Sequence, residues 1–181
     1  MQCLKTPIPR RTSNLRFVSG FTMLELMITI TIIAIGLSLA VPSIRDTMAN
    51  NQVAVANNSI VSGINLARSE AITRGNAVAV CPSNTGNGCN NGKWNRGWIV
   101  FDDTDGNATL VTAEIIRVNS RNETVNRTGF AGTIVFQPDG TTTLGTAQTM
   151  KICYADTGVT NKCRSITISR FGSVSSQETT G

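Results

Sequence analysis

The longest apolar run of the chain extends from Phe21 to Val41 and contains a single charged side chain, Glu25. A helix of about 20 apolar residues is long enough to cross a lipid bilayer. The residues ahead of this run include four basic side chains and no acidic one: Lys5, Arg10, Arg11 and Arg16. Because basic flanks stay on the cytoplasmic side, we expect the chain after Val41 to be exported. The pattern predicts a membrane-crossing helix over residues 21–41, preceded by a basic leader, residues 1–20.

The pattern changes at Pro42, which removes one helical hydrogen bond and is expected to kink the helix. From residue 42 to residue 75, apolar side chains recur at intervals of three to five: Ile44, Met48, Val53, Ala56, Ile60, Ile64, Ala67 and Ala71. This spacing is typical of an amphipathic helix. Arg74 and Gly75 supply a cation and a stop signal at its end. We therefore expect a second half of the helix that leans on a globular head.

Residues 76–181 replace the helical period with short β-type runs bounded by turn residues. These runs are Ala77–Cys81, Trp98–Phe101, Glu114–Val118, Thr133–Phe136, Met150–Tyr154 and Ser165–Ser169. Pro138-Asp139-Gly140 is a turn signal between two of them. The polar tail from Ser173 to Gly181 is expected to fray. The predicted fold class is α+β, a long N-terminal helix packed on an antiparallel β-rich head.

Composition argues against catalysis. The chain has no histidine, and histidine is the commonest general base and the commonest transition-metal ligand. We therefore expect a protein that is not an enzyme and carries no cofactor. Outside the leader, twelve basic and eleven acidic side chains nearly cancel, so the net charge of +5 does not by itself indicate a nucleic-acid-binding surface.

The apolar segment has two conventional interpretations. A signal anchor would be retained, whereas a secretory signal would be cut after Ser38-Leu39-Ala40, which satisfies the small-residue rule. Neither explains Glu25, because a carboxylate costs up to about 2.5 to 3.5 kcal/mol at a membrane centre, and less near an end. The acid therefore indicates a partner charge or a function.

The hexapeptide Gly20-Phe21-Thr22-Met23-Leu24-Glu25 resembles the processing site of type IV prepilins and of type II secretion pseudopilins. The resemblance implies that a prepilin peptidase cleaves between Gly20 and Phe21, removes the leader, and leaves a Phe21 amine that is then methylated. It also implies that Glu25 serves filament assembly by pairing with the N-terminal amine of a neighbouring subunit. The segment 21–41 would then lie first in the membrane and later in the filament core.

A second stretch resembles the GspH/FimT group of pilin-like proteins. It comprises Asn65-Leu66-Ala67-Arg68-Ser69-Glu70-Ala71, a strand reaching Cys81, Trp94, and Gly97-Trp98-Ile99-Val100-Phe101-Asp102. With the processing site, the resemblance runs from Gly20 to about Gly106 and is faint afterwards. It implies a minor type IV pilin that primes pilus assembly or links the tip complex to the major fibre.

The same resemblance implies the partners and the location. The partners would be other minor pilins, the major pilin, the prepilin peptidase and the inner-membrane assembly platform. The subunit would first cross the bacterial inner membrane once, with its head in the periplasm, and would then enter the pilus. A minor pseudopilin of a type II secretion system would share every N-terminal feature, and a cleaved periplasmic protein without a filament role is a further alternative.

Four cysteines form two closely spaced pairs, Cys81 with Cys89 and Cys153 with Cys163. In an exported domain this usage indicates disulfides. Four cysteines allow three connectivities, and the short separations favour two local bridges. A zinc site ranks below disulfides, because neither pair has the ligand spacing of zinc motifs. We therefore expect no metal at these thiols.

A calcium loop is a weaker hypothesis for one acidic segment. Asp103, Asp105, Asn107 and Glu114 have the spacing of calcium ligands in such loops. Gly106, however, stands at the fourth position rather than the sixth, no flanking helices are predicted, and Asp-Gly is a common hairpin turn. The hairpin interpretation is favoured, and no metal is assigned.

Nucleic-acid binding, as in a DNA-uptake pilin, is the remaining alternative. Four aromatic residues could form a stacking platform for bases: Trp94, Trp98, Phe101 and Phe130. Packing against the helix is the favoured role for such side chains. Three cations, Lys162, Arg164 and Arg170, would give only a modest phosphate footprint. We interpret them as a solvated face.

Overall fold

The computed structural model describes residues 20–89, 94–110, 114–120, 125–155 and 162–180. The described elements are one long helix, one short 3-10 helix and eight strands: α1 (Met23–Arg74), β1 (Val78–Pro82), η1 (Trp94–Arg96), β2 (Gly97–Asp102), β3 (Ile115–Ser120), β4 (Val125–Gly129), β5 (Ile134–Phe136), β6 (Gln148–Tyr154), β7 (Lys162–Ile168) and β8 (Val174–Thr180). The chain divides into two compact units between Ala40 and Val41, and each unit is described by itself.

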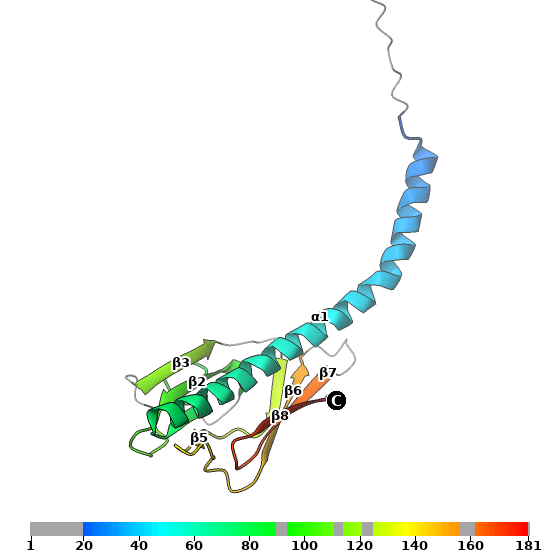
Figure 1. The fold of residues 1–181 in the computed structure, drawn as a ribbon. Coiled ribbons are helices and arrows are strands. Elements are labelled where there is room, and N and C mark those ends of the chain that lie inside the picture. Colours follow the sequence, from blue (N-terminus) through cyan, green and yellow to red (C-terminus); the bar gives the residue numbers. More distant parts are fainter. Residues whose placement is uncertain (1–19, 90–93, 111–113, 121–124, 156–161, 181) are drawn as a thin grey trace, which may run out of the picture. The chain divides into compact units, whose positions relative to one another are not determined.

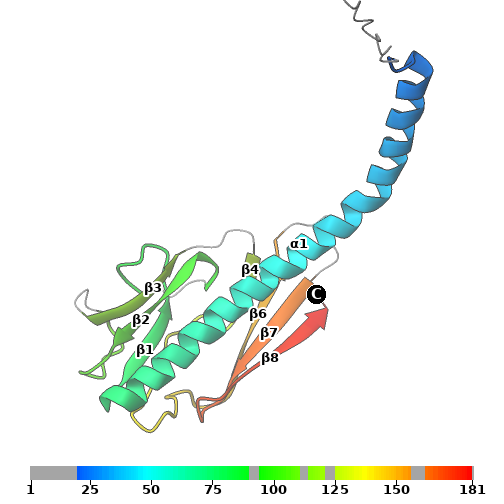
Figure 2. The ribbon, with the colours of Figure 1, turned by 45° about the horizontal axis from the view of Figure 1, so that its top comes forward.

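The unit from Val41 onward contains two antiparallel sheets of four strands each. One sheet has the strand order β3-β2-β1-β5 and the other has the order β4-β6-β7-β8. The second part of α1 lies across both sheets (Figure 1). Figure 2 shows the strands of the two sheets on either side of this helix. The α+β fold class and the antiparallel head are therefore confirmed.

The core of this unit lies between α1 and the two sheets. It contains helix residues from Val53 to Ala71 together with side chains of six strands. Strand β2 shows how the sequence makes this core, because side chains alternate between the two faces of a sheet. Trp98 and Val100 face the core with α1, whereas Ile99 and Phe101 belong to a second cluster. The first sheet therefore buries both of its faces.

The buried side of α1 follows the predicted spacing over most of its length. Six of the eight predicted positions are buried: Val53, Ala56, Ile60, Ile64, Ala67 and Ala71. The prediction is wrong for Ile44 and Met48, which are 52% and 57% exposed. Burial begins at Ala49, because the head covers the helix only from that residue onward.

Two strands were not predicted from the sequence. Strand β4 pairs with β6 along five residues. The tail expected to fray forms β8, in which each residue from Val174 to Thr180 pairs with a residue of β7. The prediction of a frayed tail was wrong because main-chain hydrogen bonds to β7 hold β8, and these do not require apolar side chains.

Candidate processing and assembly segment

The helix start is built by the residues of the processing motif. Thr22 precedes α1, and its hydroxyl oxygen accepts a hydrogen bond from the Glu25 N–H at 3.2 Å. The Thr22 carbonyl accepts the first helical bond, from the Leu26 N–H, at 3.2 Å. A threonine followed three residues later by glutamate is a capping-box sequence. The motif therefore begins the helix at Met23 and leaves Gly20 and Phe21 outside it, with 78% of Phe21 exposed.

The first part of α1 exposes its large apolar side chains. From Phe21 to Leu37 these side chains are between 51% and 79% exposed. By length and composition α1 is apolar enough to cross a membrane, and it is the one described helix with this property. Such a surface requires a lipid bilayer or apolar protein neighbours, because water exposure would cost the free energy of apolar hydration.

Hydroxyl side chains in this segment are compatible with apolar surroundings. Thr29, Thr31 and Ser38 donate hydrogen bonds of 2.7 to 2.8 Å to main-chain carbonyls of the preceding turn. Their donors are thus satisfied within the helix itself. These three residues therefore need no polar partner from a neighbouring molecule.

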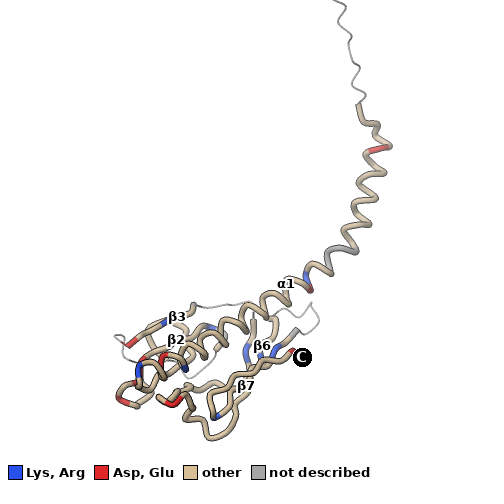
Figure 3. Tube along the Cα trace, viewed as in Figure 1, with Lys and Arg blue, Asp and Glu red and all other residues tan. Residues whose placement is uncertain are grey.

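Glu25 differs from these hydroxyl residues. In the part of the chain that the structure describes, its carboxylate has no hydrogen bond or ion pair, whereas its main-chain N–H is bonded to Thr22. Figure 3 shows one acidic position near the start of α1 and no other charged position between it and the grey stretch of the helix. The next charged residues in the sequence are Arg45 and Asp46. An unpaired carboxylate thus lies in an otherwise uncharged helical segment.

Two predicted features of this region are not tested by the structure. The leader lies outside the described residues, apart from Gly20. At Pro42 the helix is continuous along its backbone, and the kink expected there remains a prediction.

Both disulfides join the cysteines that are close in sequence. Cys81 bonds to Cys89, and Cys153 bonds to Cys163. The second bridge links directly paired positions of β6 and β7. The local connectivity that the spacing favoured is therefore confirmed.

The aromatic residues do not form a surface platform. Trp94, Trp98 and Phe101 are at most 2% exposed, and Phe130 packs against the core. Core packing, the favoured interpretation, is thus confirmed, and the three buried rings are not accessible to bases in this conformation.

The cations expected on a solvated face have local partners. Arg164 forms a 2.6 Å ion pair with Glu178, and the Arg170 guanidinium lies 4.6 Å from the centre of the Phe171 ring. The side chain of Lys162 lies outside the described residues. Arg164 and Arg170 thus each have a partner within the head, and the interpretation of the three cations as one solvated face stays a prediction.

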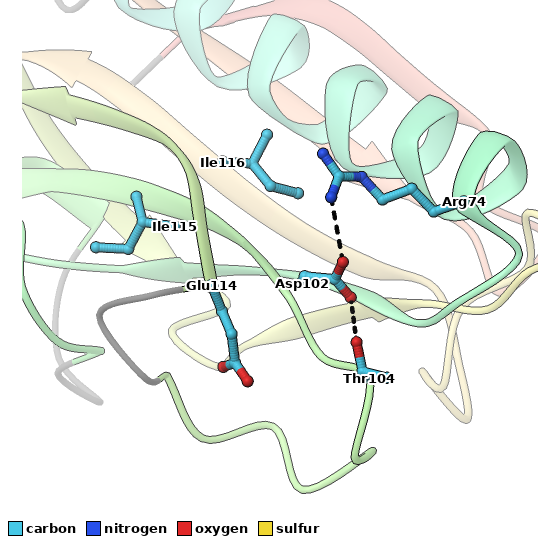
Figure 4. A pocket seen from close by; sticks show the side chains of 6 residues that line it. All are labelled: Arg74, Asp102, Thr104, Glu114, Ile115 and Ile116. Carbon is cyan, nitrogen blue, oxygen red and sulfur yellow. Dashed lines mark hydrogen bonds and ion pairs between the residues drawn. The ribbon is translucent and has the colours of Figure 1, made fainter.

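The end of α1 is held to β2 by an ion pair that the sequence did not predict. Arg74, at the last position of the helix, contacts Glu70 at 2.7 Å and Asp102 at 3.2 Å. The other Asp102 oxygen accepts a hydrogen bond from Thr104 (Figure 4). The hydrogen bond that Arg74 donates to the Glu70 carboxylate raises the pKa of Arg74 above its ordinary value. Arg74 therefore connects the end of α1 to strand β2 through its ion pair with Asp102.

One arginine of the head is buried and has no acidic partner among the residues that the structure describes. Arg127, on β4, is 9% exposed and donates a hydrogen bond to the Trp94 carbonyl. Burial lowers the pKa of this guanidinium to about 10. The contact ties β4 to the 3-10 helix, and its signal in the sequence was too weak to be found.

The chain combines two features of a pilin-like subunit. Its long helix is capped at the start and exposes an apolar first part, and the second part of the same helix packs on antiparallel sheets. Comparison with known families agrees with this class. A family model described as "Type II transport protein GspH" matches residues 56–172, and one described as "Prokaryotic N-terminal methylation motif" matches residues 15–41. The chain therefore belongs to the GspH family and carries the N-terminal methylation motif. No curated protein matches the chain significantly.

Solved structures give the same fold. The chain is similar to two crystal forms of the type IV minor pilin FimU of Pseudomonas aeruginosa strain PAO1, at 18% and 19% identity. The TM-scores are 0.51 and 0.53, with 68% and 70% of this chain and 90% and 89% of the FimU chains covered. At this identity the likeness shows the pilin fold. Family membership implies assembly with other pilins and processing through the methylation motif.

Proposed function

We propose that this protein is a minor type IV pilin, a structural subunit without enzymatic activity. The single observation that carries the proposal is the unpaired Glu25 carboxylate in the exposed apolar part of α1. In a bilayer such a charge is unfavourable by up to about 3 kcal/mol, and pairing it with a cation removes this cost.

Processing would supply that cation. Cleavage between Gly20 and Phe21 creates a new N-terminal ammonium, four residues before Glu25. The peptide bond to be cut lies ahead of the helix and is exposed, so the peptidase need not unwind α1. The amine of one subunit and the carboxylate of its neighbour then neutralise each other as the subunit leaves the membrane. Residues 21–41 become the filament core, and the expected kink at Pro42 would lie between this core segment and the part of the helix that packs on the head.

The proposed location and partners follow from this mechanism. The subunit crosses the inner membrane with its basic leader in the cytoplasm and its disulfide-bonded head in the periplasm. Prepilin peptidase and the assembly platform act on it there. In the pilus it contacts other minor pilins and the major pilin, either priming assembly or linking the tip complex to the fibre.

A Glu25→Gln variant tests the mechanism. We expect it to be cleaved and to accumulate in the membrane, with its amount in sheared pili reduced by at least about tenfold, since about 1.4 kcal/mol corresponds to a factor of ten. Glu178→Gln is the matched control, because Glu178 is 80% exposed and its surface ion pair contributes little. Wild-type incorporation of Glu25→Gln would refute the role of the carboxylate.

The family's own description favours one second candidate, a minor pseudopilin of a type II secretion system. A deletion strain separates the two functions. Loss of pili with normal export of secreted enzymes supports the pilin, whereas normal pili with enzymes retained in the periplasm supports the pseudopilin.

A further inference from the structure

The loop that joins β2 to β3 begins with a buried acid. Asp103 directly follows β2 and is 1% exposed. Its Oδ1 accepts a hydrogen bond from the Ala108 N–H at 2.9 Å, and its carbonyl accepts one from the Gly106 N–H at 3.0 Å. These bonds fold residues 103–108 into a compact loop around the carboxylate.

The second oxygen of this carboxylate has no partner. In the described part of the chain, Oδ2 of Asp103 is buried and lacks any hydrogen bond. A buried carboxylate oxygen without a donor or cation is unfavourable, because the desolvation of the charge is not compensated. The side chain lines a depression of about 480 Å³, bordered by the loop, by residues 75–77 and by residues 135–143. The buried, unpaired group thus lies beside a depression in the surface of the head.

The charged side chains near Asp103 are themselves acidic, so they cannot neutralise its carboxylate. The neighbouring carboxylates of Asp105 and Glu114 carry the same charge as Asp103 and repel it. Asp105 is exposed and accepts hydrogen bonds from the main chain and side chain of Asn107. Figure 4 shows the Glu114 carboxylate pointing away from Arg74, toward the loop that follows Thr104. The local field therefore attracts a cation.

The C-terminal part of this loop is held in place by apolar contacts with the first sheet. Ala108 and Leu110 pack against the cluster of Phe101 and Val135 on the outer face of the first sheet. Ala108 has a φ of 54°, the one positive value among the described non-glycine residues. It stands at the sixth position counted from Asp103, where a calcium loop requires a sharp turn and normally uses glycine. The position of Gly106 is therefore no argument against a calcium loop, because Ala108 supplies the required backbone conformation.

We propose that the loop 103–109, together with Glu114, binds one Ca²⁺ ion. Among the described residues no three acidic, histidine or cysteine side chains meet at one point. The site would therefore combine the carboxylates of Asp103 and Asp105 with the Asn107 side chain, main-chain oxygens and water, and Glu114 would approach when the ion binds. Such mixed oxygen sets and flexible geometry suit Ca²⁺ better than Mg²⁺, which demands a near-ideal octahedron.

Calorimetric titration of the full-length mature protein in detergent, after treatment with a chelator, tests the proposal with CaCl₂ alone as probe. We expect one site with a Kd of about 0.1 to 1 mM, the range of extracellular calcium modules, and a higher melting temperature in Ca²⁺ than in equimolar Mg²⁺. Asp105→Asn should weaken binding by at least about tenfold, because it removes one formal ligand charge.

Two controls separate Ca²⁺ binding from a loss of folding, and the titration itself does not depend on whether the protein is a pilin. Asp105 is exposed, so its replacement should leave the melting temperature without Ca²⁺ unchanged, and Glu178→Gln should bind Ca²⁺ like the wild type. Absence of saturable binding up to about 10 mM, well above the expected range, would overturn the proposal. Equal affinity in Asp105→Asn and wild type would overturn it as well.

Discussion

Gly63 shows at the scale of one residue how closely α1 approaches the first sheet. A Cβ atom at this position would lie 2.7 to 2.9 Å from three carbons of the Trp98 ring. The ring is rigid and 2% exposed, so it has no room to move away. Glycine is therefore required here by close packing, although it weakens the helix by roughly 1 kcal/mol relative to alanine.

We predict that Gly63→Ala destabilises the head by about 1 to 2 kcal/mol, since overpacking outweighs the gain in helix propensity. Urea unfolding of the mature protein in detergent, followed by tryptophan fluorescence, measures the change. Gly145→Ala is the control, because a Cβ atom there meets nothing within 4 Å. A Gly63→Ala protein as stable as the control would show that the contact with Trp98 is looser than described.

The roles of some single residues can be predicted from the sequence, whereas those of others cannot. Gly20, Phe21 and Glu25 stand out because a charge in an apolar run is rare and the hexapeptide is specific. Thr22 also has a local signal, the capping-box spacing to Glu25, which predicts the helix start that the structure shows. The Arg74 contact with Asp102 joins residues 28 positions apart and depends on the tertiary fold, so no pattern near either residue could predict it.

At the scale of elements, hydrophobic periodicity predicted the strands whose buried side chains are apolar. It missed the strands that are held mainly by main-chain hydrogen bonds. Strands β1, β2 and β5 have buried, mainly apolar runs and were found. Strand β8 is almost entirely polar, and its pairing with β7 gives no period-2 signal. Strand β4 alternates buried and exposed positions, but one of its buried side chains is Arg127, which conceals the pattern.

The bridge between β6 and β7 gives a prediction at the same scale. Cys153 and Cys163 close a loop of about ten residues, for which chain entropy suggests a stabilisation of about 2 to 3 kcal/mol. We therefore expect Cys153→Ala/Cys163→Ala to lower the urea midpoint by the corresponding amount while Cys81–Cys89 stays oxidised, as thiol labelling after denaturation would show. An unchanged midpoint would mean that β6 and β7 gain no stability from the bridge.

At the scale of the whole molecule, the chain joins a unit that needs apolar neighbours to one that folds around its own core. The exposed apolar part of α1 cannot be explained by the isolated subunit, whereas the head buries both faces of its first sheet. The pilin class was predictable because its N-terminal signal is local and specific. The position of the subunit within a filament was not, because it depends on the surfaces of other chains.

The proposed filament function requires cleavage of the bond between Gly20 and Phe21. The intact mass and N-terminal sequence of the protein recovered from membranes and from sheared pili test it most directly. We predict a mature chain that begins at Phe21 and is heavier by one methyl group, in both fractions. A mature chain that begins at Val41, the cut expected of a secretory signal after Ala40, would lack Glu25 and would contradict the filament function.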